Sequence, residues 1–294
     1  MRHIALLILI SCSMHAQTSF HSSTNSLRIK ITGENAAQIN NELNLHFWKR
    51  IFPGKELKRI NAIEIEIEGK AGFPAEIQDW RWLGRLSITA PQLDKFPPEI
   101  FRLKNLEELD LEKTDIGELP VDLKRLEKLE TLIIIETPLK GTLPELPDHL
   151  SCLQLISCGS AVNIASAYRC AGLGELMIEN AGLSVLPGEI GNLKRLKKIE
   201  LPGNKLEKLP AEIGNLKEVL LLNVSGNKIS ELPKELEQMT KLQMLNLENN
   251  KLEVLNIDFS KMPNLKEIFL SGNPMKKEEQ LRIEKAAKNI KVHY

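Results

Sequence analysis

The sequence repeats itself at a constant period over most of its length. An apolar residue begins each repeat, and the position numbers of consecutive starts differ by 23 (83 − 60, for example), except for one difference of 21 (150 − 129). The ten starts are Ile60, Leu83, Leu106, Leu129, Leu150, Leu173, Leu196, Val219, Leu242 and Leu265. Because one such unit is too short to bury its own apolar residues, units in phase predict a stack whose neighbours share a continuous core.

Each repeat combines two spacings of apolar residues. Its first half reads LxxLxL and ends in strict alternation, which is typical of a short strand with one buried face. Its second half reads LPxxIxxL, a wider spacing that predicts a helical or 3₁₀ turn. We therefore predict an α/β solenoid, a curved stack in which parallel strands form a concave sheet and return arms lie behind it.

A polar residue interrupts this pattern at one fixed position, where the chain leaves the strand. Asparagine holds the position in four units, at Asn204, Asn227, Asn250 and Asn273. A buried amide both donates and accepts hydrogen bonds, so these side chains are predicted to form a ladder with the turns of neighbouring units. The ladder is predicted to be degenerate in the earlier units. There the position holds Glu68, Pro91, Thr114, Thr137, Cys158 and Ala181.

These units resemble leucine-rich repeats of the type that carries LPxxIxxL on the return arm, and the resemblance covers residues 60–294. The shorter unit, which ends in TLPELPDHL, is similar to the short LPx-type repeats of bacterial proteins. The resemblance implies a bacterial protein. The stretch SAVNIASAYRCAG after Gly159 lacks the LP pair, so its return arm is expected to be irregular.

The ends of a repeat stack need caps, because the apolar residues of the terminal units would otherwise face water. We assign residues 26–59 to an N-terminal cap, a strand LRIKI followed by an amphipathic helix from Glu34 to Ile51. Residues 274–294 are expected to form the C-terminal cap, a helix with Leu281 and Ile283 facing inward and then a closing strand IKVHY.

Residues 1–16, MRHIALLILISCSMHA, have the layout of a secretory signal peptide, with a positive start, an apolar run and then small or polar residues. The run is far shorter than the roughly 20 residues that cross a bilayer, so no membrane span is expected. Two processing routes fit: cleavage after Ala16, and lipidation of Cys12, where LISC resembles the lipobox of bacterial lipoproteins. Both predict an extracytoplasmic protein, and the second adds a lipid anchor.

Composition and motifs point away from nucleic acid and from catalysis. The 39 basic residues balance the 39 acidic ones, and aromatic residues make up 4%, so neither a basic field nor many stacking rings are available. No GxSxG, HExxH or glycine-rich phosphate loop occurs, so we expect no enzyme, no cofactor and no metal site. Cys152, Cys158 and Cys170 fit no zinc spacing and are expected to be buried thiols, with one disulfide as the alternative.

The outward side chains of the predicted concave strands are the candidates for function. Apolar residues are unusual at positions that face water. They cluster in three adjacent units, at Ile133, Ile135, Ile156 and Met177. Carboxylates flank them, at Glu108, Asp110, Glu112, Glu175 and Glu179. An apolar centre with a charged rim is how a protein interface is built, although β-branched residues at these positions also simply favour the strand.

We therefore expect this protein to bind a protein or peptide on its concave face. The partner is expected to carry basic residues around an apolar group, because these would suit the acidic rim. The alternative is a structural protein of the cell envelope or an adhesin, anchored by lipid at Cys12 and making diffuse surface contacts. A third hypothesis, an effector with ligase activity, is suggested only by the LPx-like unit, and no catalytic domain is expected to accompany it.

Overall fold

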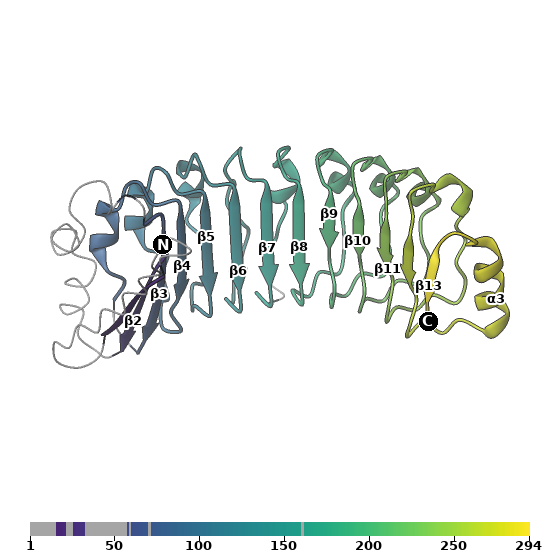
Figure 1. The fold of residues 1–294 in the computed structure, drawn as a ribbon, viewed down its shortest axis with the longest axis horizontal. Coiled ribbons are helices and arrows are strands. Elements are labelled where there is room, and N and C mark those ends of the chain that lie inside the picture. The colour runs from purple at the N-terminus through teal and green to yellow at the C-terminus, as the bar shows by residue number, and fades with distance from the viewer. Residues whose placement is uncertain (1–15, 22–25, 33–57, 59, 70–71, 160–161) are drawn as a thin grey trace, which may run out of the picture. The chain divides into compact units, whose positions relative to one another are not determined.

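The computed structural model describes residues 16–21, 26–32, 58, 60–69, 72–159 and 162–294. The chain forms two compact units, Met1–His149 and Leu150–Tyr294, and each is described by itself. Their boundary coincides with the end of the one shorter repeat, at Leu150. Within both units strands alternate with short 3₁₀ helices (Figure 1), as the two spacings in each repeat predict.

The first unit has an antiparallel strand pair at one edge of its sheet, followed by parallel strands from consecutive repeats. β1 pairs antiparallel with β2, and β2 to β6 pair in parallel in sequence order. The register joins residues one repeat apart, so that Arg85 lies opposite Glu108. The elements of this unit are β1 (Ala16–His21), β2 (Ser26–Thr32), β3 (Ala62–Glu68), η2 (Ala75–Asp79), β4 (Arg85–Thr89), η3 (Pro98–Arg102), β5 (Glu108–Glu112), η4 (Val121–Arg125) and β6 (Thr131–Ile135).

The second unit has a sheet that is parallel throughout its described pairings. β7 to β13 pair in sequence order, and the register again joins residues one repeat apart, such as Met177 and Glu200. Its strands are β7 (Cys152–Ile156), β8 (Glu175–Glu179), β9 (Lys198–Glu200), β10 (Leu221–Asn223), β11 (Met244–Asn246), β12 (Glu267–Phe269) and β13 (Lys291–His293). Its helices are η5 (Ala167–Arg169), η6 (Gly188–Asn192), η7 (Ala211–Asn215), η8 (Lys234–Gln238), η9 (Phe259–Lys261) and the α-helix α3 (Lys277–Ala286).

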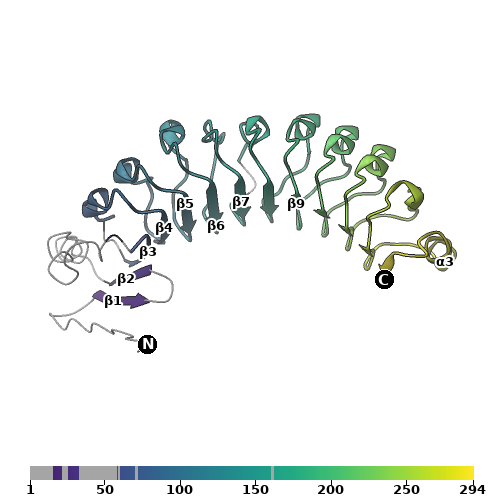
Figure 2. The same ribbon diagram turned by 45° about the horizontal axis from the view of Figure 1, so that its top comes forward.

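The 3₁₀ helices begin where the sequence places the LP pair. Pro120, Pro187 and Pro210 directly precede η4, η6 and η7 in extended conformation, because the proline ring fixes φ and the missing N–H is not needed there. The isoleucines of the LPxxIxxL pattern, such as Ile190 and Ile213, are fully buried. Within each unit the helices lie on one side and the strands on the other (Figure 2), which confirms an α/β solenoid architecture.

The predicted asparagines of the second unit lie in the turns that follow its strands, with their amides in the interior. Nδ2 of Asn227 donates to the carbonyls of Leu201 and Val224, both at 2.9 Å. Its Oδ1 accepts from the backbone amide of Leu206 at 3.0 Å. Each amide thus links its own turn to the preceding repeat. The same contacts recur at Asn204, Asn250 and Asn273.

Threonines hold the equivalent position in part of the first unit. Thr114 and Thr137 are both buried, and their hydroxyl oxygens lie 3.2 Å apart. Thr137 Oγ1 also accepts from the backbone amide of Thr114 at 3.3 Å and donates to the carbonyl of Ile135 at 3.2 Å. A short hydroxyl ladder therefore continues the polar contacts where the sequence pattern looks degenerate.

The helix α3 and the strand β13 follow β12, but one of the two helix residues expected to face inward does not. Ile283 on α3 is fully buried, whereas Leu281 is 44% exposed. Residues two apart on an α-helix lie on nearly opposite faces, so the two side chains cannot both face the stack. Polar contacts also attach the helix to the repeat that begins at Leu242. Glu279 Oε1 accepts from the amide of Leu255 at 2.8 Å, and Arg282 donates to the carbonyl of Leu255 at 2.6 Å.

Several expectations at the N-terminal end lie outside the described residues. The amphipathic helix from Glu34 to Ile51, and Cys12 with the rest of residues 1–15, are among them. Ala16 begins β1, and β2 supplies the strand expected at the start of the cap. Among the described residues, no helix combines the length and apolar character needed to cross a membrane.

Candidate functional site

Strand alternation places the candidate side chains on the open face, which is the sheet face opposite the 3₁₀ helices. In β5, Leu109 and Leu111 are fully buried, whereas Glu108, Asp110 and Glu112 point the other way and are half-buried. The same alternation recurs in β6 and, within the second unit, in β7 and β8. The candidates are therefore accessible in part, because alternate residues of a strand point to opposite faces of the sheet.

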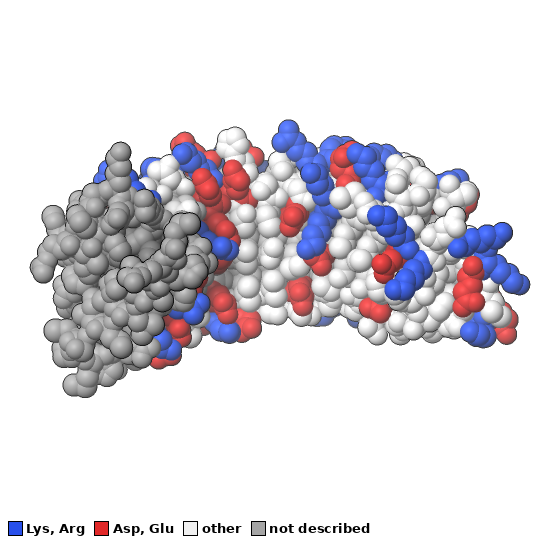
Figure 3. All heavy atoms as spheres, viewed as in Figure 1, with Lys and Arg blue, Asp and Glu red and all other residues white. Residues whose placement is uncertain are grey.

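The predicted residues of the first unit lie on two adjacent strands. We call this set the unit-1 patch, and it consists of Glu108, Asp110, Glu112, Ile133 and Ile135. Strand register places Asp110 beside Ile133 and Glu112 beside Ile135, and both isoleucines are half-buried. Acidic side chains gather on this part of the face next to uncharged surface (Figure 3). The first unit thus sets apolar and acidic side chains next to one another.

Asp110 is the electrostatically perturbed member of the unit-1 patch. Its Oδ1 is buried and has no hydrogen-bond partner among the described residues. Its Oδ2 lies 3.9 Å from Nε of Arg85, whose guanidinium also pairs with Glu108. Burial first, and then the charge of Glu108, raise the pKa of Asp110 to about 6, against the opposing effect of Arg85. A carboxylate held with too few partners is a common feature of functional surfaces.

The predicted residues of the second unit also lie on two adjacent strands. We call this set the unit-2 patch, and it consists of Ile156, Glu175, Met177 and Glu179. Register places Ile156 beside Glu179, and Gln154 beside Met177. Ile156 and Met177 are half-buried, and Glu175 is exposed. The second unit therefore repeats the arrangement of the first, an apolar side chain next to a carboxylate.

The sequence analysis places all nine residues in one patch. Because they belong to two units that are described separately, this single patch stays a prediction. The predicted site residues also did not include Arg85, the cation that pairs with the unit-1 patch. Arg85 lies one period before Glu108, and residues one period apart face each other in the sheet. The repeat length alone therefore predicts which residues face each other on adjacent strands, including Arg85 and Glu108.

Two further features of the open face in the second unit were missed. Lys198 Nζ lies 2.5 Å from Glu200 Oε1 on β9, and this hydrogen bond raises the pKa of Lys198. The rings of Phe269 and His293 are stacked, with centroids 4.2 Å apart, and His293 Nε2 lies 3.1 Å from Glu267 Oε2. These contacts leave the face of mixed charge, with one aromatic pair at β12 and β13.

The remaining candidates for chemistry give no site in the described part of the chain. Cys152, Cys158 and Cys170 are thiols, and the last two are buried. The Cys158 thiol donates to the carbonyl of Ile156 at 3.5 Å. Within the described ranges, no three His, Cys, Asp or Glu side chains are grouped so as to hold a metal ion.

Comparisons with known proteins agree with this architecture. Residues 172–287 match a family described as a leucine-rich repeat region. The chain matches no curated protein in sequence. Its repeats and its fold therefore support a leucine-rich repeat assignment, with the family match covering part of the second unit.

Three solved structures illustrate the likeness. An internalin from Listeria monocytogenes is 17% identical, with 81% of this chain and 75% of that one covered and a TM-score of 0.60. The leucine-rich repeat domain of the type III effector XopL is 23% identical, with 81% and 82% covered and a TM-score of 0.61. The ectodomain of the Arabidopsis thaliana receptor kinase GASSHO1/SCHENGEN3, solved in complex with Casparian strip integrity factor 2, is 26% identical, with 74% of this chain but 28% of that one covered and a TM-score of 0.58.

Proposed function

We propose that this leucine-rich repeat protein binds a protein or peptide partner through the open face of its sheet, and that it acts there by binding and not by catalysis. A role in protein interaction agrees with the receptor ectodomain of similar fold, which was solved in complex with Casparian strip integrity factor 2. The observation that carries the proposal is the pairing of half-buried apolar side chains with carboxylates, at Asp110 with Ile133 and at Ile156 with Glu179.

The chemistry of the partner follows from these pairs. Covering a half-exposed isoleucine with an apolar group removes surface from water at about 25 cal/mol per Å². A lysine or arginine beside that group would pair with carboxylates such as Glu179, which lies beside Ile156 in the sheet. We therefore propose a partner segment in which an apolar side chain is flanked by basic ones.

A display experiment tests this chemistry without knowledge of the natural partner. Random peptides on phage are selected on the wild-type protein and counter-selected on the double variant Ile135→Asp/Met177→Asp. The matched control is Val121→Asp/Val254→Asp, which changes one exposed valine in each unit, both away from the strands. We expect enrichment of basic and apolar residues, at least tenfold weaker binding to the open-face variant, and unchanged binding to the control.

Circular dichroism and melting curves must show that both double variants remain folded. Acidic or purely polar winners, or peptides that bind the open-face variant as tightly as the wild type, would remove the basis of the proposal. A pH series adds a second readout. Because the pKa of Asp110 is about 6, a basic peptide should bind more tightly at pH 7.5 than at pH 5, and Asp110→Asn should reduce that difference.

We further infer from the sequence that the protein is exported. The layout of residues 1–16 favours export, and Cys12 in LISC offers a lipid anchor for a cell-envelope protein or adhesin. Palmitate labelling of the wild type and of Cys12→Ala, with mass spectrometry of the mature N-terminus, distinguishes the two processing routes. Label lost in Cys12→Ala favours the anchored form, and an unlabelled N-terminus at Gln17 favours plain cleavage.

A further inference from the structure

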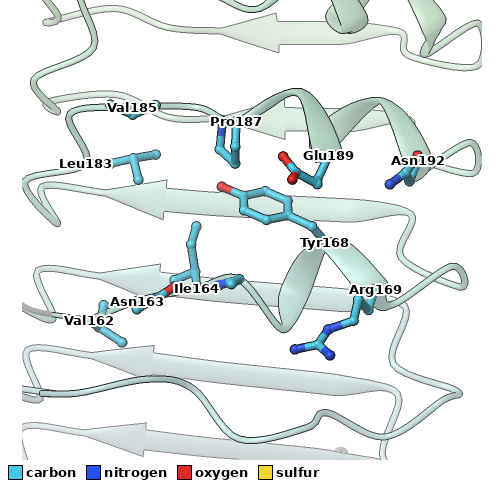
Figure 4. A pocket seen from close by; sticks show the side chains of 11 residues that line it. Val162, Asn163, Ile164, Tyr168, Arg169, Leu183, Val185, Pro187, Glu189 and Asn192 are labelled. Atoms are coloured by element: carbon cyan, nitrogen blue, oxygen red, sulfur yellow. Dashed lines mark hydrogen bonds between the residues drawn. The ribbon is translucent and has the colours of Figure 1, made fainter.

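The helix side of the second unit contains a pocket of about 530 Å³ beside the irregular return arm. Its arm carries the three-residue helix η5 in place of the five-residue helices of neighbouring arms such as η6. The cap residue of η5 is Ser166 in helical conformation, whereas an extended proline, Pro187, precedes η6. The arm without the LP pair thus carries a shorter helix, and the pocket, which we call the arm pocket, lies between this arm and the next one (Figure 4).

The walls of the arm pocket are largely apolar. Ile164 is buried at its base, and Leu183 and Pro187 come from the following repeat. Val185 also lines it and is 66% exposed. Pockets that hold small molecules have volumes of about 300–1,000 Å³ and mostly apolar linings with a few polar groups. The arm pocket falls within this description.

One polar side chain inside the pocket lacks a partner. Tyr168 is 5% exposed, and its hydroxyl finds no hydrogen-bond partner among the described residues. The hydroxyl points toward Leu183 and Pro187 (Figure 4), both of which line the pocket. Burial first, and then the charge of Glu189, raise the pKa of Tyr168, so its hydroxyl stays protonated at neutral pH and is available as a donor. An unsatisfied buried hydroxyl is costly, and a bound acceptor would remove that cost.

The charged groups of the lining set the charge of the ligand. Arg169 and Glu189 both line the pocket and carry opposite charges. Glu189 also lies close enough to the Tyr168 ring to affect its hydroxyl, so an anion placed at the hydroxyl would be repelled. A neutral acceptor such as a carbonyl oxygen avoids that repulsion.

We propose that the arm pocket binds a small, neutral, mainly apolar molecule whose carbonyl-type oxygen accepts a hydrogen bond from Tyr168. The site lies on the helix side of the second unit, away from the open face, so it is independent of the proposed partner binding. The pocket would give the protein a ligand site on the side of the repeat unit that does not carry the sheet.

Nile red, a neutral aromatic dye with one carbonyl group, is the probe. Its fluorescence is titrated with the wild type, Val185→Glu, Tyr168→Phe and the control Val254→Glu. Val254 holds the same position within its repeat as Val185 does and is 48% exposed, but it does not line the pocket. Both glutamate variants add the same charge to an exposed position, so a difference between them reports on the pocket.

We expect saturable one-to-one binding to the wild type and to Val254→Glu, and at least tenfold weaker binding to Val185→Glu. Tyr168→Phe should weaken the dye about threefold to tenfold through loss of one hydrogen bond, while its melting temperature without dye stays the same or rises. Absence of saturable binding, or equal affinities for the two glutamate variants, would overturn the proposal. A lowered melting temperature in Tyr168→Phe would overturn the assigned role of the hydroxyl, because it would reveal an existing partner.

Discussion

Replacing Asn227 with leucine removes a side chain that joins two consecutive repeats while leaving a side chain of similar size. The native residue is 7% exposed, its two N–H groups donate to three nearby carbonyls, and its Oδ1 accepts one hydrogen bond from the backbone amide of Leu206. Because the interior of a repeat stack excludes water, the groups left behind have no solvent to replace these bonds. We therefore expect the variant to lose stability through unpaired polar groups and not through a cavity.

The magnitude follows from which groups lose their last partner. The amide of Leu206 has Asn227 Oδ1 as its acceptor, and leaving it unpaired costs about 1–3 kcal/mol. The carbonyls that Asn227 contacts at 2.9 Å each keep a donor from Asn204 or Asn250. The amide has two N–H groups, so the bonds that it donates count as two, and each is worth only its net contribution, about 1 kcal/mol. We expect a total loss of about 3–5 kcal/mol in the free energy of unfolding.

Urea unfolding followed by circular dichroism measures this loss, with hydrogen exchange to localise it. Asn215→Leu is the matched control, since Asn215 is exposed at the end of η7. The melting temperature of Asn227→Leu should fall by about 10 °C, and amide protection should drop first in the repeats around Leu206, because repeat units depend on their neighbours. A loss below about 1 kcal/mol, or one equal to that of Asn215→Leu, would refute the account of the ladder.

Two further predictions concern single groups. Burial raises the pKa of Asp110 from 3.8 to about 6, so the folded state binds its proton more tightly than the unfolded state, and the stability present at low pH is lost as the pH rises through about 6. Asp110→Asn should therefore stabilise the protein by about 1–2 kcal/mol at pH 7.5, after discounting for partial exposure, and by much less at pH 4; equal melting-temperature shifts at the two pH values would contradict this. Gly214→Ala should destabilise by about 1–3 kcal/mol, because an added Cβ would overlap the carbonyl oxygen of Glu235. Gly117→Ala has open space and should be near neutral, so similar urea midpoints for the two variants would count against the close packing of these arms.

Much of the fold can be predicted from the repeat alone, because period and alternation act locally. The alternation in each LxxLxL run correctly separated Leu109 from Asp110, since a strand has only two faces. The LP pair correctly predicted the start of helices such as η6, because proline restricts its own backbone conformation. Leu281 was placed on the wrong face because its inward position was inferred from apolar character without the 100° step of a helix.

Features that depend on several repeats together were beyond the sequence. The raised pKa of Asp110 arises from burial by neighbouring strands and from charges on Glu108 and Arg85, so no single residue carries the signal. The hydroxyl contact between Thr114 and Thr137 was not predicted, because only asparagine was expected to form a ladder at this position of the repeat. The arm pocket requires both a short η5 and the side chain of Val185, which belongs to the following repeat.

Site-specific photo-crosslinking tests the open-face assignment most directly. A benzophenone amino acid is placed at Ile133 and Met177 on the open face, and at Val121 and Val254 away from the strands. Each unit thus carries one open-face position and one control position. Each protein is irradiated with a bound peptide or with an extract that supplies a partner. The account predicts crosslinked partner from the open-face positions and none from the two valines. Crosslinks from Val121 or Val254, with none from Ile133 and Met177, would contradict it.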